Sequence, residues 1–187
     1  MMENRPERII LGIDPGTTIM GYGVISDNGK SVTMLAMGVI KLSNFNSQAL
    51  KLRRIFERTL GLVEQYKPDE LSIESPFYGK NVQSMLKLGR AQGVAMAAAL
   101  YRDIPIFEYS PLEIKKSITG NGSASKEQVA AMLNRLLTFD KNPETLDATD
   151  GLAAAMCHYF KRTKGIKGKT YAGWKNFLAD NPDRIKK

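Results

Sequence analysis

Three runs of apolar or β-branched residues open the chain, and each is typical of an extended strand. They cover residues 8–14, 21–26 and 31–40, and the sequence DNGK at positions 27–30 is typical of a tight hairpin turn. We therefore expect an antiparallel meander of three strands at the start of the fold.

Helical and extended segments alternate after the meander. Apolar residues recur at helical spacing over 48–66, a strand is predicted over 70–74, and a long helix over 81–102. A fifth strand is predicted over 104–109, where Pro105 favours a place at the edge of the sheet.

Three further helices are predicted towards the C-terminal end, over 111–118, 125–137 and about 145–160. Ser125 and Gln128 form a capping-box pattern at the start of the second one. This order of elements predicts an α/β fold with a five-stranded mixed sheet, in which three antiparallel strands are followed by two parallel ones, flanked by helices.

One face of the helix over 81–102 carries small residues. Gly89, Gly93 and Ala97 lie one turn apart and leave room for another element to approach closely. The pattern leaves open whether that element is the sheet or a second subunit.

The composition fits one well-packed domain with a basic end. The chain has 187 residues and a formal net charge of +8. Residues 161–187 hold nine Lys or Arg against two Asp, so most of the excess charge is there. We expect a domain over 1–160 and a basic tail over 161–187, which is either disordered or an additional DNA contact.

The cysteine content and the lengths of the apolar runs indicate in which compartment the protein is found. Cys157 is the single cysteine, which excludes an internal disulfide framework and a CxxC zinc site and fits a reducing cytoplasm. The longest run of small apolar residues, 94–100, is far shorter than the roughly 20 residues of a membrane helix. We expect a cytoplasmic protein with no membrane segment and no export signal.

Four carboxylates occupy positions that favour a common site. Asp14 and Glu74 each end an apolar strand, and Asp147 and Asp150 share one face of a first helical turn with no basic residue in the six that follow. Taken one at a time, they are equally typical of helix caps, turns or surface acids. Together they indicate hard oxygen ligands for Mg²⁺ or Mn²⁺ and predict two-metal hydrolysis of a phosphodiester.

Four stretches of the chain resemble the RuvC family, the bacterial Holliday junction resolvases of the RNase H-like superfamily. They read LGIDPGTTIMGYGVI, LSIESPFYGKNVQSMLKLGRAQGVA, IFEYSPLEIKKSITGNGSASKEQV and LDATDGLAAAMCHYF. The resemblance implies an RNase H-like fold and a homodimer that resolves four-way DNA junctions by symmetric paired nicks in recombination and repair. It implies two Mg²⁺ per subunit, replaceable by Mn²⁺, and the RuvA–RuvB branch-migration complex as a partner. The family's catalytic and metal-binding acids fall on Asp14, Glu74, Asp147 and Asp150.

The resemblance also implies residues that contact DNA. A base-stacking aromatic falls on Phe77, and basic positions near the scissile phosphate fall on Lys115 and Lys126. Further candidates for backbone contacts are Lys80, Lys87 and Arg90. The lone histidine, His158, lies two turns beyond Asp150, where a core or surface role is favoured over metal binding.

Two rival interpretations come from other functional classes. The sequence GIDPGTT also resembles the first phosphate loop of actin, Hsp70 and sugar-kinase proteins, although no second Asp-Gly-Gly-rich loop follows. A non-catalytic module that binds DNA structures is the other rival, although it would not need all four acids.

Overall fold

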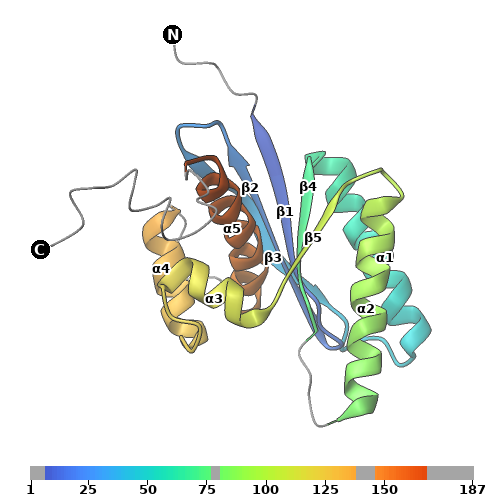
Figure 1. Cartoon of the computed structure of the whole chain (residues 1–187). Helices are drawn as coiled ribbons and strands as arrows, with labels where there is room; N and C mark the ends of the chain where they lie inside the picture. Colours follow the sequence, from blue (N-terminus) through green and yellow to red (C-terminus); the bar gives the residue numbers. More distant parts are fainter. Residues whose placement is uncertain (1–6, 77–80, 138–145, 168–187) are drawn as a thin grey trace, which may run out of the picture.

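The computed structural model describes residues 7–76, 81–137 and 146–167 of the chain. In these ranges it contains a five-stranded sheet with helices on both faces (Figure 1). In chain order, the elements are β1 (Arg8–Asp14), β2 (Ile19–Asp27), β3 (Val32–Lys41), α1 (Gln48–Tyr66), β4 (Glu70–Glu74), α2 (Val82–Leu100), β5 (Ile106–Tyr109), α3 (Pro111–Thr119), α4 (Lys126–Leu136) and α5 (Leu146–Lys167).

The strands lie in the order β3-β2-β1-β4-β5. β1, β2 and β3 form the expected antiparallel meander, while β1 pairs with β4, and β4 with β5, in parallel. This confirms the mixed α/β sheet, and the edge position of β5 confirms the interpretation of Pro105. Because β1 and β4 are parallel neighbours, their carboxyl ends meet at one edge of the sheet, called the carboxyl edge below.

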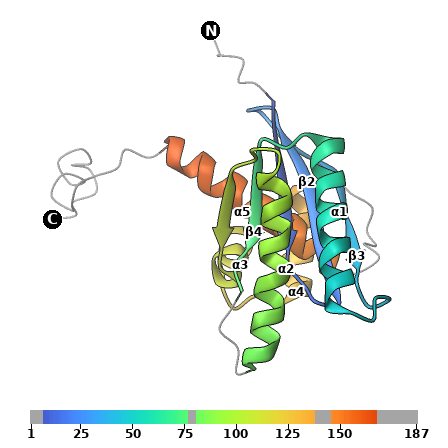
Figure 2. The same ribbon diagram turned by 90° about the vertical axis from the view of Figure 1, so that its right-hand side faces the viewer.

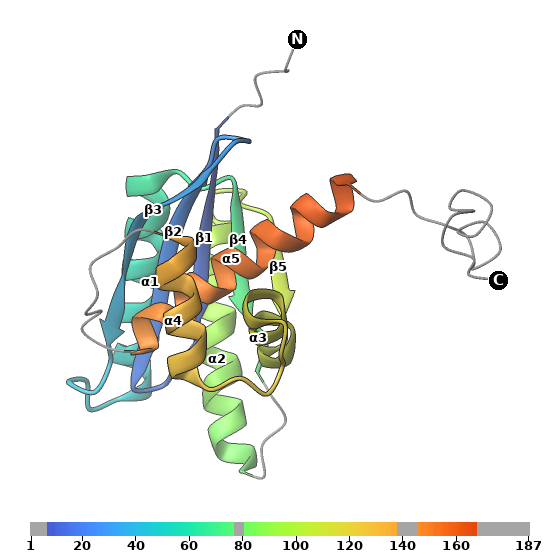
Figure 3. The ribbon, with the colours of Figure 1, turned by 90° about the vertical axis from the view of Figure 1, so that its left-hand side faces the viewer.

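Helices α1 and α2 cover one face of the sheet (Figure 2), and α3, α4 and α5 cover the other (Figure 3). Successive side chains of β1 point to opposite faces of the sheet. Leu11 and Ile13 pack in the core under α1 and α2, while Ile10 packs in the core under α5. Since Asp14 has the same parity as Ile10, the pleat places its side chain on the α5 face.

The last helix and the last strand differ from the expectation. α5 continues to Lys167 rather than ending near Phe160, because Lys161 and Arg162 are good helix formers and lie near acids on neighbouring elements, Glu113 and Glu70. β5 begins at Ile106, since Pro105 has no N–H for the ladder. None of the helices in the described residues combines the length and the apolar character of a membrane span.

Candidate active site

The α5 face of β4 is polar along its whole length. Leu71 and Ile73 point into the core under α1 and α2, so Glu70, Ser72 and Glu74 point towards α5. Glu74 therefore reaches the carboxyl edge on the same face of the sheet as Asp14. The strand alternation alone brings these two acids from distant parts of the sequence to one place.

α5 presents three residues, each one turn apart, to this polar side of β4. The Ser72 hydroxyl donates to the carbonyl of Ala154 at 2.6 Å, and His158 Nε2 lies 3.0 Å from Glu70 Oε2. One turn before Ala154, the same helix face carries Asp150, beside Glu74 and Asp14. Helix α5 thus runs antiparallel to β4 and delivers its first acidic turn to the carboxyl edge.

Glycines allow α5 to lie directly on the sheet backbone. A Cβ on Gly151 would stand 2.4 Å from Cα of Tyr22, one on Gly23 would stand 2.4 Å from Cα of Leu152, and one on Gly12 would stand 2.4 Å from N of Ala155. A Cβ on Gly21 would stand 1.9 Å from the carbonyl oxygen of Asp147. These glycines set the height of α5 above the sheet and so the distance of its acids from Asp14. Gly12, Gly21 and Gly23 lie inside strands, and glycines at such positions signal a close approach of another backbone.

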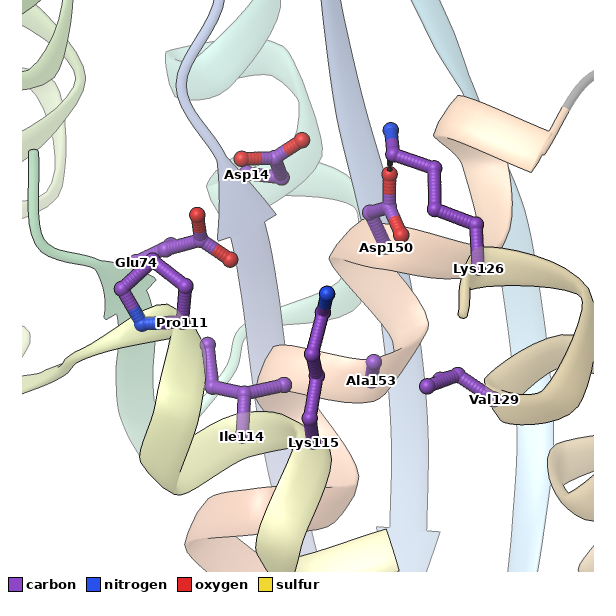
Figure 4. A pocket seen from close by; sticks show the side chains of 9 residues that line it. All are labelled: Asp14, Glu74, Pro111, Ile114, Lys115, Lys126, Val129, Asp150 and Ala153. Carbon is purple, nitrogen blue, oxygen red and sulfur yellow. Dashed lines mark hydrogen bonds and ion pairs between the residues drawn. The ribbon is translucent and has the colours of Figure 1, made fainter. Parts of the chain in front are cut away.

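Three of the four predicted acids line one pocket of about 190 Å³ (Figure 4). Its walls come from β1, β4, α3, α4 and α5, and the lining residues are Asp14, Glu74, Pro111, Ile114, Lys115, Lys126, Val129, Asp150 and Ala153. In Figure 4 the carboxylates of Asp14 and Glu74 stand on one side and that of Asp150 on the other, and the Lys115 amine rises between them. Asp147 is outside the lining and contacts it through Lys126.

Burial and mutual repulsion perturb the acids. Burial, followed by the nearby charges of Glu74 and Asp150, raises the pKa of Asp14 to about 8. Burial and the charge of Asp150 raise the pKa of Glu74 to about 7. Burial also raises the pKa of Asp150, although Lys126 opposes that shift. Carboxyl groups with such raised pKa values are typical of a site where a bound cation or a proton neutralises the negative charge.

Lys126 forms ion pairs with two of these acids. Its Nζ lies 2.5 Å from Asp150 Oδ2 and 3.3 Å from Asp147 Oδ1. Burial lowers the pKa of Lys126, but the hydrogen bonds and charges of the two aspartates outweigh that effect and raise it overall. Residues 151–156 carry no basic side chain, and the partner of these acids comes from α4 instead.

The donors at the carboxyl edge suit a hard divalent cation. They are carboxylate oxygens without nearby sulfur or imidazole in the pocket lining, which favours Mg²⁺ or Mn²⁺ over zinc. Within the described ranges, no three Asp, Glu, His or Cys side chains lie close enough together to coordinate one metal ion. The acids share a pocket but stand apart, with two of them held by Lys126.

The other predicted site residues are placed differently. Lys115 lines the pocket, whereas Lys87 and Arg90 are exposed on α2. A smaller crevice next to Glu74, lined also by Pro15, Ser75, Pro76 and Leu88, places this part of α2 beside the site. Phe77 and Lys80 lie outside the described residues.

His158 has the core role that its position favours. It is buried, and its Nδ1 lies 2.7 Å from the Tyr109 hydroxyl while Nε2 faces Glu70. Burial lowers the pKa of His158 and outweighs the opposing effect of Glu70. The neutral imidazole donates a hydrogen bond to Glu70 and accepts one from Tyr109. Both ring nitrogens therefore have protein partners, and neither is free to bind a metal.

Gln92 is a residue that sequence reasoning missed. It is buried on α2, and its Nε2 donates to Glu108 Oε2 at 2.8 Å and lies 3.5 Å from the carbonyl oxygen of Glu74. It joins α2 to the ends of β4 and β5. A glutamine in an otherwise small and apolar stretch is the signal that could have indicated it.

This sheet order, with its helices on both faces and acids at the carboxyl edge, defines an α/β domain of the RNase H-like class. The family model of crossover junction endodeoxyribonuclease RuvC matches residues 10–158. The protein of that name from Bacteroides fragilis is 63% identical to this chain, over 100% of both chains. The one from Cytophaga hutchinsonii is 58% identical, over 96% of this chain and 89% of the relative. The structure of Thermus thermophilus RuvC in complex with a Holliday junction substrate superposes with a TM-score of 0.78 at 30% identity, covering 84% of this chain and 96% of that one.

The chain therefore belongs to the RuvC family of crossover junction endodeoxyribonucleases. The resemblance found in the sequence is confirmed, as are the RNase H-like fold and the enzyme class. The interpretation as a nucleotide-handling protein of the actin type is not supported.

Proposed function

We propose that this chain cuts four-way DNA junctions by hydrolysing a phosphodiester at the acidic pocket, with Asp14, Glu74, Asp147 and Asp150 as its metal ligands. The observation that carries the proposal is the convergence of Asp14, Glu74 and Asp150 on one pocket that also holds two lysines. Membership of the RuvC family makes the chain a junction endonuclease of DNA recombination and repair.

The four acids would hold two Mg²⁺ per subunit, with Mn²⁺ as a substitute, since carboxylate oxygens prefer such hard cations. Bound there, the ions would supply an activated water and neutralise the charge on the leaving 3′ oxygen. The protein contributes the negative donors and their spacing. Asp14 and Glu74 come from rigid strands, and Asp147 and Asp150 come from a helix seated on the same sheet.

The two lysines of the pocket would bind the phosphate that is cut. Lys115 reaches between Glu74 and Asp150, where its charge can offset that of the non-bridging phosphate oxygens (Figure 4). Lys126 lies on the opposite wall and can approach the same group. Burial of the pocket strengthens both interactions, because the effective dielectric constant is lower there.

DNA contacts outside the pocket are part of the proposal. Phe77, which follows β4 closely in the sequence, would stack on a base at the opened junction, and Lys80 would contact a phosphate. Lys87 and Arg90 are exposed on the part of α2 that adjoins the acidic site and form no ion pair among the described residues, so they are available to the DNA backbone.

The face of α2 opposite the sheet supports a homodimer. Val82, Leu86 and Leu100 are 65%, 51% and 56% exposed and fall on one side of the helix. Between them, a Cβ added at Gly89 or Gly93 would meet nothing within 4 Å. The two glycines therefore do not pack on the sheet, which favours a second subunit as the element that approaches this face. We propose that a second copy covers this face and so provides two sites for paired nicks.

The cellular partners follow from the same assignment. We propose that the dimer acts in the cytoplasm on four-way junctions, with the RuvA–RuvB complex as its partner in branch migration. The basic tail over 161–187, most of which lies outside the described residues, would add affinity for DNA.

The test uses a labelled synthetic four-way junction and a linear duplex of the same sequence. In Mg²⁺ the protein should produce paired nicks in the junction and leave the duplex uncut, and in Ca²⁺ it should bind the junction without cutting. Equal cutting of both substrates, or cutting that persists in a chelator, would contradict the proposal. Binding without cutting in Mg²⁺ would instead support the non-catalytic alternative.

A further inference from the structure

Lys126 occupies an electrostatically unfavourable place on its own helix. It is the first residue of α4, directly after the capping Ser125, where the positive end of the helix dipole repels a cation. Its ammonium points away to α5, at 2.5 Å from Asp150 and 3.3 Å from Asp147. The acids of α5, rather than any feature of α4, account for the position of this charge.

An ammonium in this position excludes a divalent cation from it. Mg²⁺ binds oxygen at about 2.0–2.1 Å, so an ion held by Asp147 and Asp150 would occupy the same space as Nζ, and the two positive charges would repel. Lys126 thus engages two of the four acids that the proposed function assigns to the metal. Metal binding by these acids therefore requires Nζ to leave.

The Lys126 side chain has room to leave the two carboxylates. Its side chain is 48% exposed, and it also lines the pocket in which the substrate phosphate would lie. Four rotatable bonds let Nζ turn from the carboxylates to a phosphate oxygen without movement of α4. Lys115 lines the same pocket but makes no ion pair with Asp147 or Asp150, so it does not compete with the metal in this way.

We propose that Lys126 is an internal counter-ion that occupies the metal position on Asp147 and Asp150 in the DNA-free protein and is drawn away by the substrate phosphate. Binding of metal at this position and binding of DNA are then coupled, and each strengthens the other by the same factor. Without DNA, the position on Asp147 and Asp150 binds metal weakly, and binding of a junction increases its affinity for metal. The inference rests on the proposed function, because it takes Asp147 and Asp150 as metal ligands.

The experiment measures Mn²⁺ binding to the full chain without DNA, by titration calorimetry. Lys126→Met removes the competing charge and should bind Mn²⁺ more tightly than the parent protein, by about tenfold or more, because a positive charge within contact distance of the ion repels it strongly. Lys126→Arg keeps the charge and Lys116→Met removes an exposed charge from the neighbouring helix α3, so both should stay within about twofold of the parent. In thermal melts, Mn²⁺ should also raise the Tm of Lys126→Met more than that of the parent.

Unchanged or weaker Mn²⁺ binding by Lys126→Met would overturn the inference, and so would a gain of the same size in Lys116→Met. Adding Asp150→Asn to the Lys126→Met protein separates this failure from failure of the proposed function. If the double variant binds Mn²⁺ as tightly as Lys126→Met does, the metal site itself is elsewhere. If the double variant loses binding and Lys126→Met gains none over the parent, the metal site stands and only the counter-ion role falls.

A second measurement covers the case in which Lys126→Met folds poorly. Lys126→Gln retains a polar side chain, and junction affinity can be measured with and without Ca²⁺. The parent protein should bind the junction several-fold more tightly when Ca²⁺ is present, and Lys126→Gln should show a smaller gain. An equal gain in both proteins would contradict the coupling.

Discussion

Gly151 on α5 lies directly against Tyr22 on β2, so that a Cβ at Gly151 would stand 2.4 Å from the Tyr22 Cα. Backbone meets backbone at this point, one residue after Asp150. The contact fixes how far the first turn of α5, with its acids, stands from the end of β1. A glycine with no chemistry of its own thus sets the geometry of the acidic pocket.

Gly151→Ala should therefore damage both stability and site geometry. The added methyl has no flexible neighbour to displace, so α5 must shift, at a cost of about 2 kcal/mol or more. Gly61→Ala is the matched control, because Gly61 is on α1 with nothing within 4 Å of an added Cβ. That change should stabilise the protein by about 0.5–1 kcal/mol. Thermal melts and junction cleavage of both variants test this, and a Gly151→Ala protein with normal Tm and cleavage would show that α5 tolerates the shift.

The acidic pocket should make the metal-free protein less stable as pH rises. The pKa of Asp14 is about 8 in the folded protein against 3.8 unfolded, so the folded state holds a proton that the unfolded chain has lost. The stabilisation is complete below about pH 4 and disappears as pH rises through 8. Glu74, with a pKa of about 7, acts in the same direction.

Asp14→Asn removes the Asp14 share of this dependence. At pH 8 in a chelator, the variant should be more stable than the parent by on the order of 2 kcal/mol, or roughly 5 °C in Tm for a chain of this size. Asp103→Asn is the control, since Asp103 is exposed and its left-handed backbone (φ 57°) accepts asparagine. Parallel pH profiles for the parent and Asp14→Asn would show that the carboxyl is not perturbed.

The homodimer predicts different outcomes for two exposed leucines. Leu86→Glu places a charge on the proposed α2 interface and should yield a folded monomer, whereas Leu50→Glu, at a similarly exposed leucine on α1, should remain dimeric. Analytical ultracentrifugation distinguishes them. A dimeric Leu86→Glu protein would place the interface on another surface.

Strong local patterns made most of the fold predictable. The observed bounds of β1, α1 and β4 match the sequence expectation, because each is set by a local signal, such as the sequence Lys67-Pro68-Asp69 that ends α1. The end of α5 was misjudged because no Pro or strong cap marks it. Its extension depends on contacts of Lys161 and Arg162 with other elements.

The acids of the site were predictable because they stand at the ends of predicted elements. Asp147 and Asp150 follow from their place in the first turn of the last predicted helix. Asp14 and Glu74 follow from their positions on two strands and from parallel pairing, which the order of elements already favours. The ion pairs of Lys126 and the glycine contacts of α5 arise from how helices pack on one another and on the sheet, and no short-range pattern encodes that packing. The buried network of His158, Glu70 and Tyr109 likewise joins three elements distant in sequence.

Cleavage by the Asp14→Asn protein tests the central claim most directly. The change keeps the shape of the side chain and removes the charge, so it should reduce Mg²⁺-dependent cutting of a labelled four-way junction by about 10³-fold or more while junction binding in Ca²⁺ stays within a few-fold of the parent. Asp103→Asn should cut as the parent does. Paired nicks at the parental rate from Asp14→Asn would contradict the assignment of the acidic pocket as the catalytic site.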